Sequence, residues 1–90
     1  MSDALFSVRD QVVLVSGGSR GIGRAIAEGF AQRGGRVIIT GREASTLAST
    51  AQEIGAHPIV CDVADPAAIA RLVESALGQF GRIDTLLNVA

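Results

Sequence analysis

The sequence predicts an α/β fold with a doubly wound parallel sheet. Short apolar runs rich in β-branched residues recur along the chain without polar alternation, which is typical of strands covered on both faces. Between these runs, apolar residues recur at helical spacing, and a dense glycine cluster joins the first run to the first helical segment. Strands that alternate with helices form parallel sheets through right-handed crossovers. The expected element order is βαβαβαβ, with strand order 3-2-1-4.

The first strand is expected over residues 11–16, which contain the continuous apolar run Val12-Val13-Leu14-Val15. The helix that follows begins near Gly21. It carries apolar residues at four-residue spacing, namely Ile22, Ile26 and Phe30, so that one face can pack on a sheet. Gly34-Gly35 is expected to end this helix, as glycine commonly does at a helix C-terminus.

The second strand is expected over residues 36–40, with a turn at Gly41. The next helix carries Leu47, Ala51 and Ile54 and closes at Gly55. The third strand is expected over residues 58–61, with Pro58 at its first position, where a missing N–H is tolerated.

A third helix and a fourth strand complete the pattern. Asp65 is expected to cap this helix, with Pro66 at the first helical position. Gly81 is expected to stop it, and residues 83–89 form the fourth strand. The helix carries an apolar stripe made of Ile69, Leu72, Val73, Ala76, Leu77 and Phe80.

The composition predicts one small globular domain. The chain has 90 residues, of which 48% are apolar and 19% are charged, and its net charge is −1. The basic residues are all arginines and are scattered, so neither nucleic acid nor a membrane is expected as a partner. A single cysteine, Cys61, allows no internal disulfide, and the first residues lack the features of a secretion signal. These features predict a cytoplasmic protein.

The stretch SGGSRGIG, residues 16–23, places four glycines directly after the first strand. Glycine inside a regular element costs roughly 0.5–1 kcal/mol relative to alanine, so such a cluster needs a reason. In a doubly wound sheet, ligands bind outside the carboxyl ends of the strands where the strand order reverses. Glycines there allow a phosphate to approach backbone N–H groups and the positive end of the next helix. The loop, with Gly17, Gly21 and Gly23, is therefore expected to bind a phosphate-bearing ligand.

Two other glycine motifs fit less well. The spacing Gly17-x-x-x-Gly21-x-Gly23 differs from the G-x-G-x-x-G of many dinucleotide-binding proteins. A nucleoside triphosphatase loop would end in Lys-Ser/Thr, where this chain has Arg24-Ala25. A turn without any ligand is also disfavoured, because strand, glycines and helix follow one another in the order that such a site requires.

The loop resembles the T-G-x-x-x-G-I-G motif of the short-chain dehydrogenase/reductase family, with Ser16 in place of threonine. CDV at 61–63 is similar to the family's Asp-Val pair, which borders the adenine ring. NVA at 88–90 is similar to the start of its N-N-A-G motif, although Val89 departs from the second asparagine. The resemblance implies a Rossmann-like dinucleotide-binding domain of which residues 1–90 are a single N-terminal part. It adds Ile22, Val63 and Ala90 to the expected cofactor-binding residues. Ser19 in the loop is expected to donate to a phosphate oxygen, or else only to satisfy the turn.

The end of the second strand predicts which nicotinamide cofactor is bound. A bare ribose 2′-hydroxyl is usually held by Asp or Glu about 20 residues past the glycines, but this chain has Thr40-Gly41-Arg42. Arg42, together with Arg20 in the glycine loop, could instead hold a 2′-phosphate, because a guanidinium fits phosphate bidentately. The alternative is that both arginines are solvated surface charges. NADP(H) is expected, and NAD(H) is the less favoured cofactor.

Four other side chains have competing interpretations. Asp62 is expected to accept a hydrogen bond from the adenine amino group, or else to serve only as a turn carboxylate. Asn88 is expected to support the sheet and to lie near the adenosine ribose, or else to be purely structural. His57 is interpreted as a surface loop residue without a partner, and Cys61 as a small buried hydrophobe.

Catalysis in the family relies on a serine and a Tyr-x-x-x-Lys pair, and this chain contains no tyrosine and no lysine. The resemblance therefore implies the cofactor-binding part of an NADP(H)-dependent oxidoreductase that interconverts a small-molecule carbonyl and alcohol. It also implies a homo-oligomeric parent, a dimer or a tetramer. No catalytic or metal-binding residue is predicted within the chain. The alternative is a non-catalytic nucleotide-binding module or a truncated chain.

Overall fold

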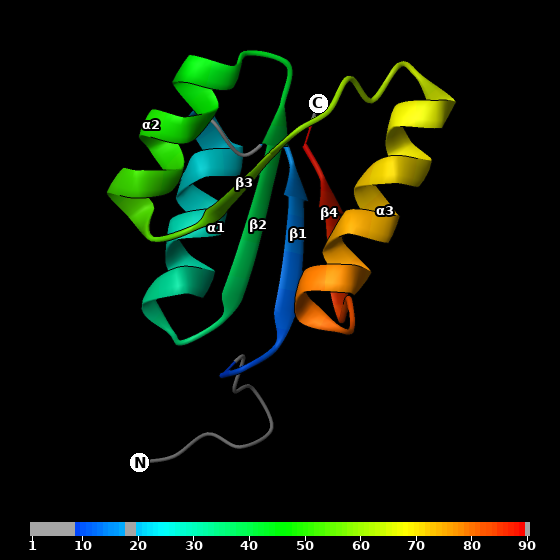
Figure 1. Ribbon diagram of the computed structural model, residues 1–90. Coiled ribbons are helices and arrows are strands. Elements are labelled where there is room, and N and C mark those ends of the chain that lie inside the picture. Colours follow the sequence, from blue (N-terminus) through cyan, green and yellow to red (C-terminus); the bar gives the residue numbers. More distant parts are fainter. Residues whose placement is uncertain (1–8, 18–19, 90) are drawn as a thin grey trace.

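The computed structural model describes residues 9–17 and 20–89. Within them, strands β1 (Val12–Ser16), β2 (Arg36–Gly41), β3 (His57–Val60) and β4 (Thr85–Asn88) alternate with helices α1 (Gly21–Gln32), α2 (Ala44–Ile54) and α3 (Pro66–Phe80). The strands form a parallel sheet in the order β3-β2-β1-β4 (Figure 1). This confirms the predicted α/β fold, element order and strand order.

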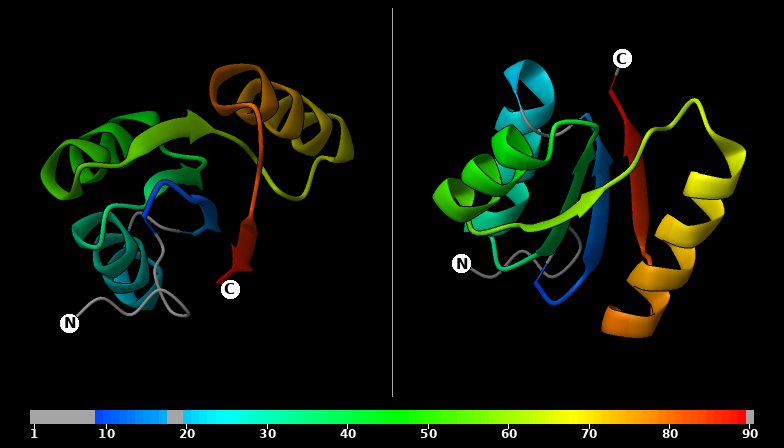
Figure 2. Two further views of the ribbon diagram at one scale, coloured as in Figure 1. Left: turned by 90° about the horizontal axis from the view of Figure 1, so that it is seen from below. Right: turned by 45° about the horizontal axis from the view of Figure 1, so that its top comes forward.

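The sheet is a central layer, with α1 and α2 on one face and α3 on the other (Figures 1 and 2). Because side chains alternate along a strand, β1 supplies both faces. Val13 and Val15 pack in a cluster with residues of α1 and α2, while Val12 and Leu14 pack in a second cluster with residues of α3. The strand therefore reads as a continuous apolar run because both of its faces are covered.

The strand register brings the carboxyl ends of three strands level with one another. Ser16, the last residue of β1, lies opposite Thr40 of β2 and Asn88 of β4. The loops that follow these strands therefore emerge at one edge of the sheet. This edge is where the glycine loop and the β3–α3 connection meet.

Two strand boundaries differ from the sequence-based expectation. β3 begins at His57, so Pro58 occupies its second position. The missing N–H is still tolerated because β3 is an edge strand. β4 spans only 85–88. Residues on either side of it still contact β1 through the backbone, since Asp84 N–H donates to the Val12 carbonyl and Val89 N–H donates to the Ser16 carbonyl.

The expected helix ends are confirmed in α2 and α3. Gly55 and Gly81 close these helices in the left-handed conformation, with φ of 76° and 78°. The Asp65 side chain accepts a hydrogen bond from the Ala67 N–H at 3.0 Å, and Pro66 begins the helix. The predicted cap is therefore present.

The helices bury less of their apolar faces than the spacing predicts. Ile22, expected on the packed face of α1, is 73% exposed, because it lies in the first turn at the edge of the sheet. In α3, Leu72 and Ala76 are buried, whereas Ile69, Val73 and Leu77 are 40%, 37% and 45% exposed. The stripe is therefore wider than the surface that the described part of the sheet offers it.

Cys61 is buried and His57 lies on the surface, as expected, but the expectation that His57 lies in a loop and has no partner was wrong. His57 is an exposed strand residue, and its ring lies edge-on to that of Phe80 with 5.4 Å between the ring centroids. The partner comes from the far end of α3, which the position of His57 in the sequence does not reveal.

None of the helices among the described residues has the length and apolar character needed to cross a membrane.

Candidate cofactor-binding site

Gly17 fixes the start of the glycine loop. Its φ is +83°, and a Cβ atom at this position would lie 2.5 Å from the backbone oxygen of Val89. The Gly17 N–H donates to the Thr40 carbonyl at 3.2 Å. Where the chain leaves β1, Gly17 therefore lies between the ends of β2 and β4. Glycine is required here both by the left-handed conformation and by the close approach of another backbone.

Helix α1 begins at Gly21. Gly21 has a φ of +63°, and no atom of another described segment lies within 4 Å of the position that a Cβ would take. Arg20 precedes the helix without a side-chain capping hydrogen bond, and the first turn contains no acidic residue. Gly23 is buried in that turn. The orphan N–H groups of a helix start and its positive dipole end favour an anion at such a place.

An open cavity of about 690 Å³, here called the loop cavity, lies at this end of the site. Arg20 and Arg42 both line it, although they come from different loops, so the two predicted cations lie around one space. Glu43 also lines it and contributes the opposite charge. Its remaining walls are formed by Gly17, Gly21, Ile22 and Val89.

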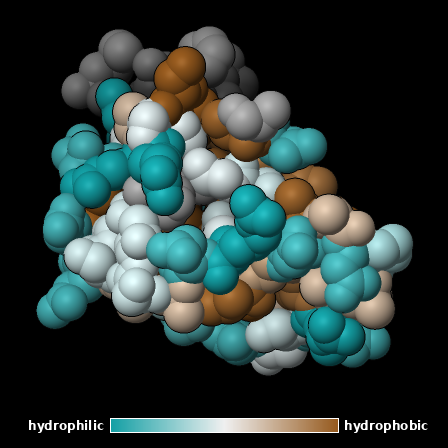
Figure 3. All heavy atoms as spheres, turned by 90° about the horizontal axis from the view of Figure 1, so that it is seen from above, coloured by the Kyte–Doolittle hydropathy of each residue, from teal (hydrophilic) through white to brown (hydrophobic). Residues whose placement is uncertain are grey.

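A second cavity of about 500 Å³, here called the strand-end cavity, lies over the carboxyl ends of the strands. It is lined by Asp62, Val63 and Asn88 of the predicted site, and it shares Gly17, Arg42 and Val89 with the loop cavity. Figure 3 views this edge of the molecule and shows hydrophilic side chains spread across it, with apolar ones between them. The two cavities place the predicted loop and strand-end residues along one continuous edge.

The local contacts of Asp62 and Cys61 limit what each can do. One Asp62 carboxylate oxygen accepts a hydrogen bond from the Ala64 N–H at 3.0 Å, so this side chain does hold the turn. The pKa of the Cys61 thiol is raised, first by burial and then by the nearby Asp62 charge. A thiol in this setting stays protonated and is a poor nucleophile.

Arg24 stands where a nucleoside triphosphatase loop would have its lysine. Its guanidinium instead pairs with the Glu53 carboxylate of α2 at 2.7 Å, outside both cavities. This arrangement weighs against a triphosphatase loop.

Within residues 9–17 and 20–89, no group of His, Cys, Asp and Glu side chains could hold a metal ion.

Sequence reasoning missed Thr40. This residue lines the strand-end cavity, is fully buried, and has a hydroxyl oxygen without a hydrogen-bond partner among the described residues. The available signal was a polar residue that ends the apolar strand Val37-Ile38-Ile39, next to the predicted site. Two other predicted site residues, Ser19 and Ala90, lie outside the described residues.

The sequence matches the short chain dehydrogenase family over residues 11–90. The chain belongs to this family. It is 39% identical over 89 residues to an uncharacterized oxidoreductase of Mycobacterium tuberculosis, covering 93% of this chain and 34% of that protein. The chain therefore spans about a third of the length of the curated relatives that it matches.

Solved structures of family members share the fold. The 3-ketoacyl-(acyl-carrier-protein) reductase of Brucella melitensis, complexed with NADH, superposes with a TM-score of 0.84 at 33% identity, covering 89% of this chain and 34% of that one. A metagenomic short-chain oxidoreductase in complex with NADP also has a TM-score of 0.84, at 38% identity, covering 89% of this chain and 38% of that one. The compared structures thus include both forms of the nicotinamide cofactor.

Proposed function

We propose that this chain binds NADP(H) as the cofactor-binding part of an oxidoreductase that interconverts a carbonyl and an alcohol. The observation that carries the proposal is the position of Arg20 and Arg42 around one cavity, next to a helix N-terminus that lacks acidic residues. A phosphate ester there would meet two guanidinium groups and the backbone N–H groups of the first helical turn.

The residues of the site suit a dinucleotide. The absent side chain at Gly17 lets the backbone pass against that of Val89, and at Gly21 no atom of another described segment lies within 4 Å of the Cβ position. At the end of β2, Gly41 and Arg42 occupy the positions where an acidic residue would select a bare ribose hydroxyl. This sequence favours the 2′-phosphate of NADP(H) over NAD(H), while relatives of known structure bind either form.

When bound, the nicotinamide supplies or accepts a hydride, and the residues of this chain bind and orient the cofactor. No tyrosine or lysine is present to transfer the accompanying proton, so we assign that step to a catalytic part of the full-length enzyme. We further propose that this enzyme is a cytoplasmic homo-oligomer acting on a small molecule. A non-catalytic nucleotide-binding protein would share the same site but would not oxidise NADPH in the presence of a carbonyl compound.

The cofactor assignment is tested by charge reversal at Arg42 in the full-length protein. Hydrogen bonds to charged groups contribute roughly 1.5–3 kcal/mol, so the loss of Arg42 is expected to weaken NADPH binding about 10–100-fold. Arg42→Asp should also strengthen NADH binding, because a carboxylate can accept from the ribose hydroxyl.

Arg36 provides a matched control, because it is an exposed arginine on the same strand at the opposite, amino end. Arg36→Asp should change the two dissociation constants equally or leave both unaltered. Unchanged dissociation constants for NADPH and NADH in Arg42→Asp would overturn the assignment of the 2′-phosphate to this residue.

A further inference from the structure

The face of the sheet that carries α3 is only partly covered by the described residues. Among them, α1 and α2 both pack on the opposite face, whereas α3 lies by itself on this one (Figures 1 and 2). On β4, Leu86 pairs with Leu14, which packs with α3, so both side chains lie on this face. Leu14 is 2% exposed, but Leu86 is 63% exposed. The part of this face over β4 is therefore apolar and open.

A groove of about 240 Å³, here called the α3 groove, lies between α3 and β4. Its apolar walls come from α3, β1 and β4, namely from Ile69, Leu72, Val73, Leu14 and Leu86. At one end it is lined by Ser16, Val63 and Asn88, which also line the strand-end cavity. The α3 groove is therefore apolar along most of its length, and one end of it lies at the carboxyl ends of the strands.

Helix α3 adds a stripe of apolar side chains beside this groove. Ile69, Val73 and Leu77 follow one another at four-residue spacing, so they lie on one side of the helix. They are between 37% and 45% exposed, whereas Leu72 and Ala76 next to them are buried. From Ile69 to Leu77 the stripe extends about 12 Å along the helix axis. An amphipathic helix of about three turns, lying alongside α3, has the length and the side-chain spacing to cover it.

The handedness of the crossovers indicates which segment can reach this groove. Crossovers between parallel strands are right-handed, so steps in opposite directions along a sheet place their helices on opposite faces. The step from β1 to β2 places α1 on one face, and the opposite step from β3 to β4 places α3 on the other. A further strand beyond β4 would continue the second step, so its crossover helix would lie on the face of α3. Such a helix would begin near Asn88, where β4 ends and where the α3 groove meets the strand-end cavity.

We propose that the α3 groove is the docking site of an amphipathic helix of the same polypeptide, formed by the segment that follows β4 in the full-length protein. The chain spans about a third of the length of the curated relatives that it matches, so a full-length protein of that size has the residues to supply this helix. The inference uses the proposed function only in treating the chain as the N-terminal part of a longer protein. The α3 face is then internal to each subunit, and copies of the protein associate through other surfaces.

Val73→Gln in the full-length protein tests whether the groove is filled. Val73 is 37% exposed among the described residues, and glutamine has a better helix propensity than valine, so an open groove predicts no loss of stability. A helix docked there would bury the polar amide, and we expect the thermal midpoint to fall by about 3–10 °C.

Glu74→Gln is the matched control, because it places the same side chain at the next position of α3, which is exposed and does not line the groove. This variant should stay within about 1–2 °C of the unaltered protein. Equal thermal midpoints for Val73→Gln and Glu74→Gln would overturn the proposal.

Photocrosslinking identifies the occupant and keeps the test valid if Val73→Gln does not fold. Replacing Leu77 by p-benzoylphenylalanine keeps an apolar side chain on the stripe, and the same replacement at Glu74 is the control. After irradiation of the full-length protein, peptide mapping should show a link within one chain, from position 77 to the segment after residue 90. A link between two chains would assign the groove to a second copy and overturn the proposal. Linking at position 77 no greater than at position 74 would also overturn it.

The docking proposal and the proposed function fail in different ways. Unchanged NADPH and NADH dissociation constants in Arg42→Asp would reject the cofactor assignment, while Val73→Gln would still lower the thermal midpoint. If the groove is open or is covered by a second copy, the full-length protein can still prefer NADPH, and the docking proposal alone is rejected.

Discussion

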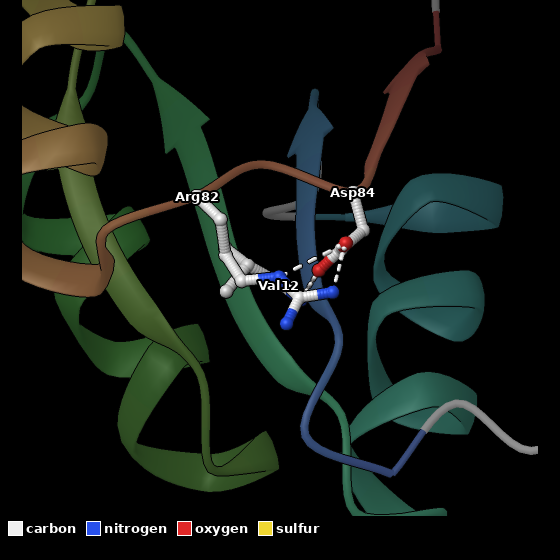
Figure 4. Close-up of polar contacts among 3 residues, drawn as sticks. All are labelled: Val12, Arg82 and Asp84. Carbon is white, nitrogen blue, oxygen red and sulfur yellow. Dashed lines mark hydrogen bonds and ion pairs between the residues drawn. The ribbon is translucent and has the colours of Figure 1, made fainter.

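Asp84 and Val12 join the amino ends of β4 and β1 by two reciprocal hydrogen bonds. The Val12 N–H donates to the Asp84 carboxylate at 2.8 Å, and the Asp84 N–H donates to the Val12 carbonyl at 2.9 Å. Arg82 donates from Nε to the other carboxylate oxygen at 3.0 Å (Figure 4). These contacts lie at the edge of the sheet opposite the candidate site, and they set the register that brings Asn88 level with Ser16.

Asp84→Asn should lower the thermal midpoint by a few degrees and make it less sensitive to acid. The pKa of the Asp84 carboxyl is lowered, first by the hydrogen bond from Arg82 and then by that from Val12. Because the folded-state pKa lies below the unfolded value, near 4, the stabilisation is complete above that pH. It is lost as the pH falls through the lower folded-state value. Thermal melts between pH 3 and pH 7 measure this difference, and parallel pH profiles for the two proteins would contradict it.

Gly17→Ala should destabilise the protein and abolish nucleotide binding. The left-handed conformation alone costs an alanine about 1–2 kcal/mol, and the added Cβ would also lie 2.5 Å from the Val89 oxygen. Urea unfolding and NADPH titration measure the two effects. Gly78→Ala is the control, because Gly78 lies inside α3 and no atom of another described segment lies within 4 Å of its Cβ position. This variant should be about 0.5–1 kcal/mol more stable than the unaltered protein. A Gly17→Ala protein as stable as Gly78→Ala would show that the loop is not held against Val89.

The sequence predicted the type and order of the helices and strands better than their first and last residues. Continuous β-branched runs and glycine stops specify strands and helix ends locally, so the element order follows from the chain itself. The limits of β4 depend instead on Asp84, whose bonds to Val12 span 72 residues of sequence. Whether other residues bury Ile22 depends on the position of the first turn of α1 relative to the sheet. The four-residue spacing of apolar residues along the helix does not reveal this position.

The candidate site shows the same division. The glycines and arginines could be selected as candidates because phosphate-binding loops have a recognisable composition at a strand end, and the structure places Gly17, Gly21, Arg20 and Arg42 around one cavity. Thr40 could not, because an unpaired hydroxyl appears only when the packing around it is known. His57 was missed as a partner of Phe80 for a similar reason, since the contact joins two distant elements.

The 90-residue chain on its own is expected to self-associate. Leu86 is 63% exposed on β4, which pairs with β1 alone among the described strands. An open strand edge with apolar side chains favours intermolecular pairing. Sedimentation velocity should show species larger than the 9.2 kDa monomer. Leu86→Lys should shift them toward monomer, while Ala48→Lys, at an exposed position of α2, should not. A monodisperse, cooperatively melting monomer would show that the exposed edge of β4 does not cause self-association.

The most direct test of the central claim is a comparison of the dissociation constants of NADPH and NADH for the unaltered full-length protein under one set of salt conditions. Contacts from Arg20 and Arg42 to the 2′-phosphate predict that NADPH binds at least tenfold more tightly. Raising the ionic strength should reduce this preference, because the arginines are exposed to solvent. Equal dissociation constants, or tighter binding of NADH, would contradict the assignment of these arginines to a 2′-phosphate.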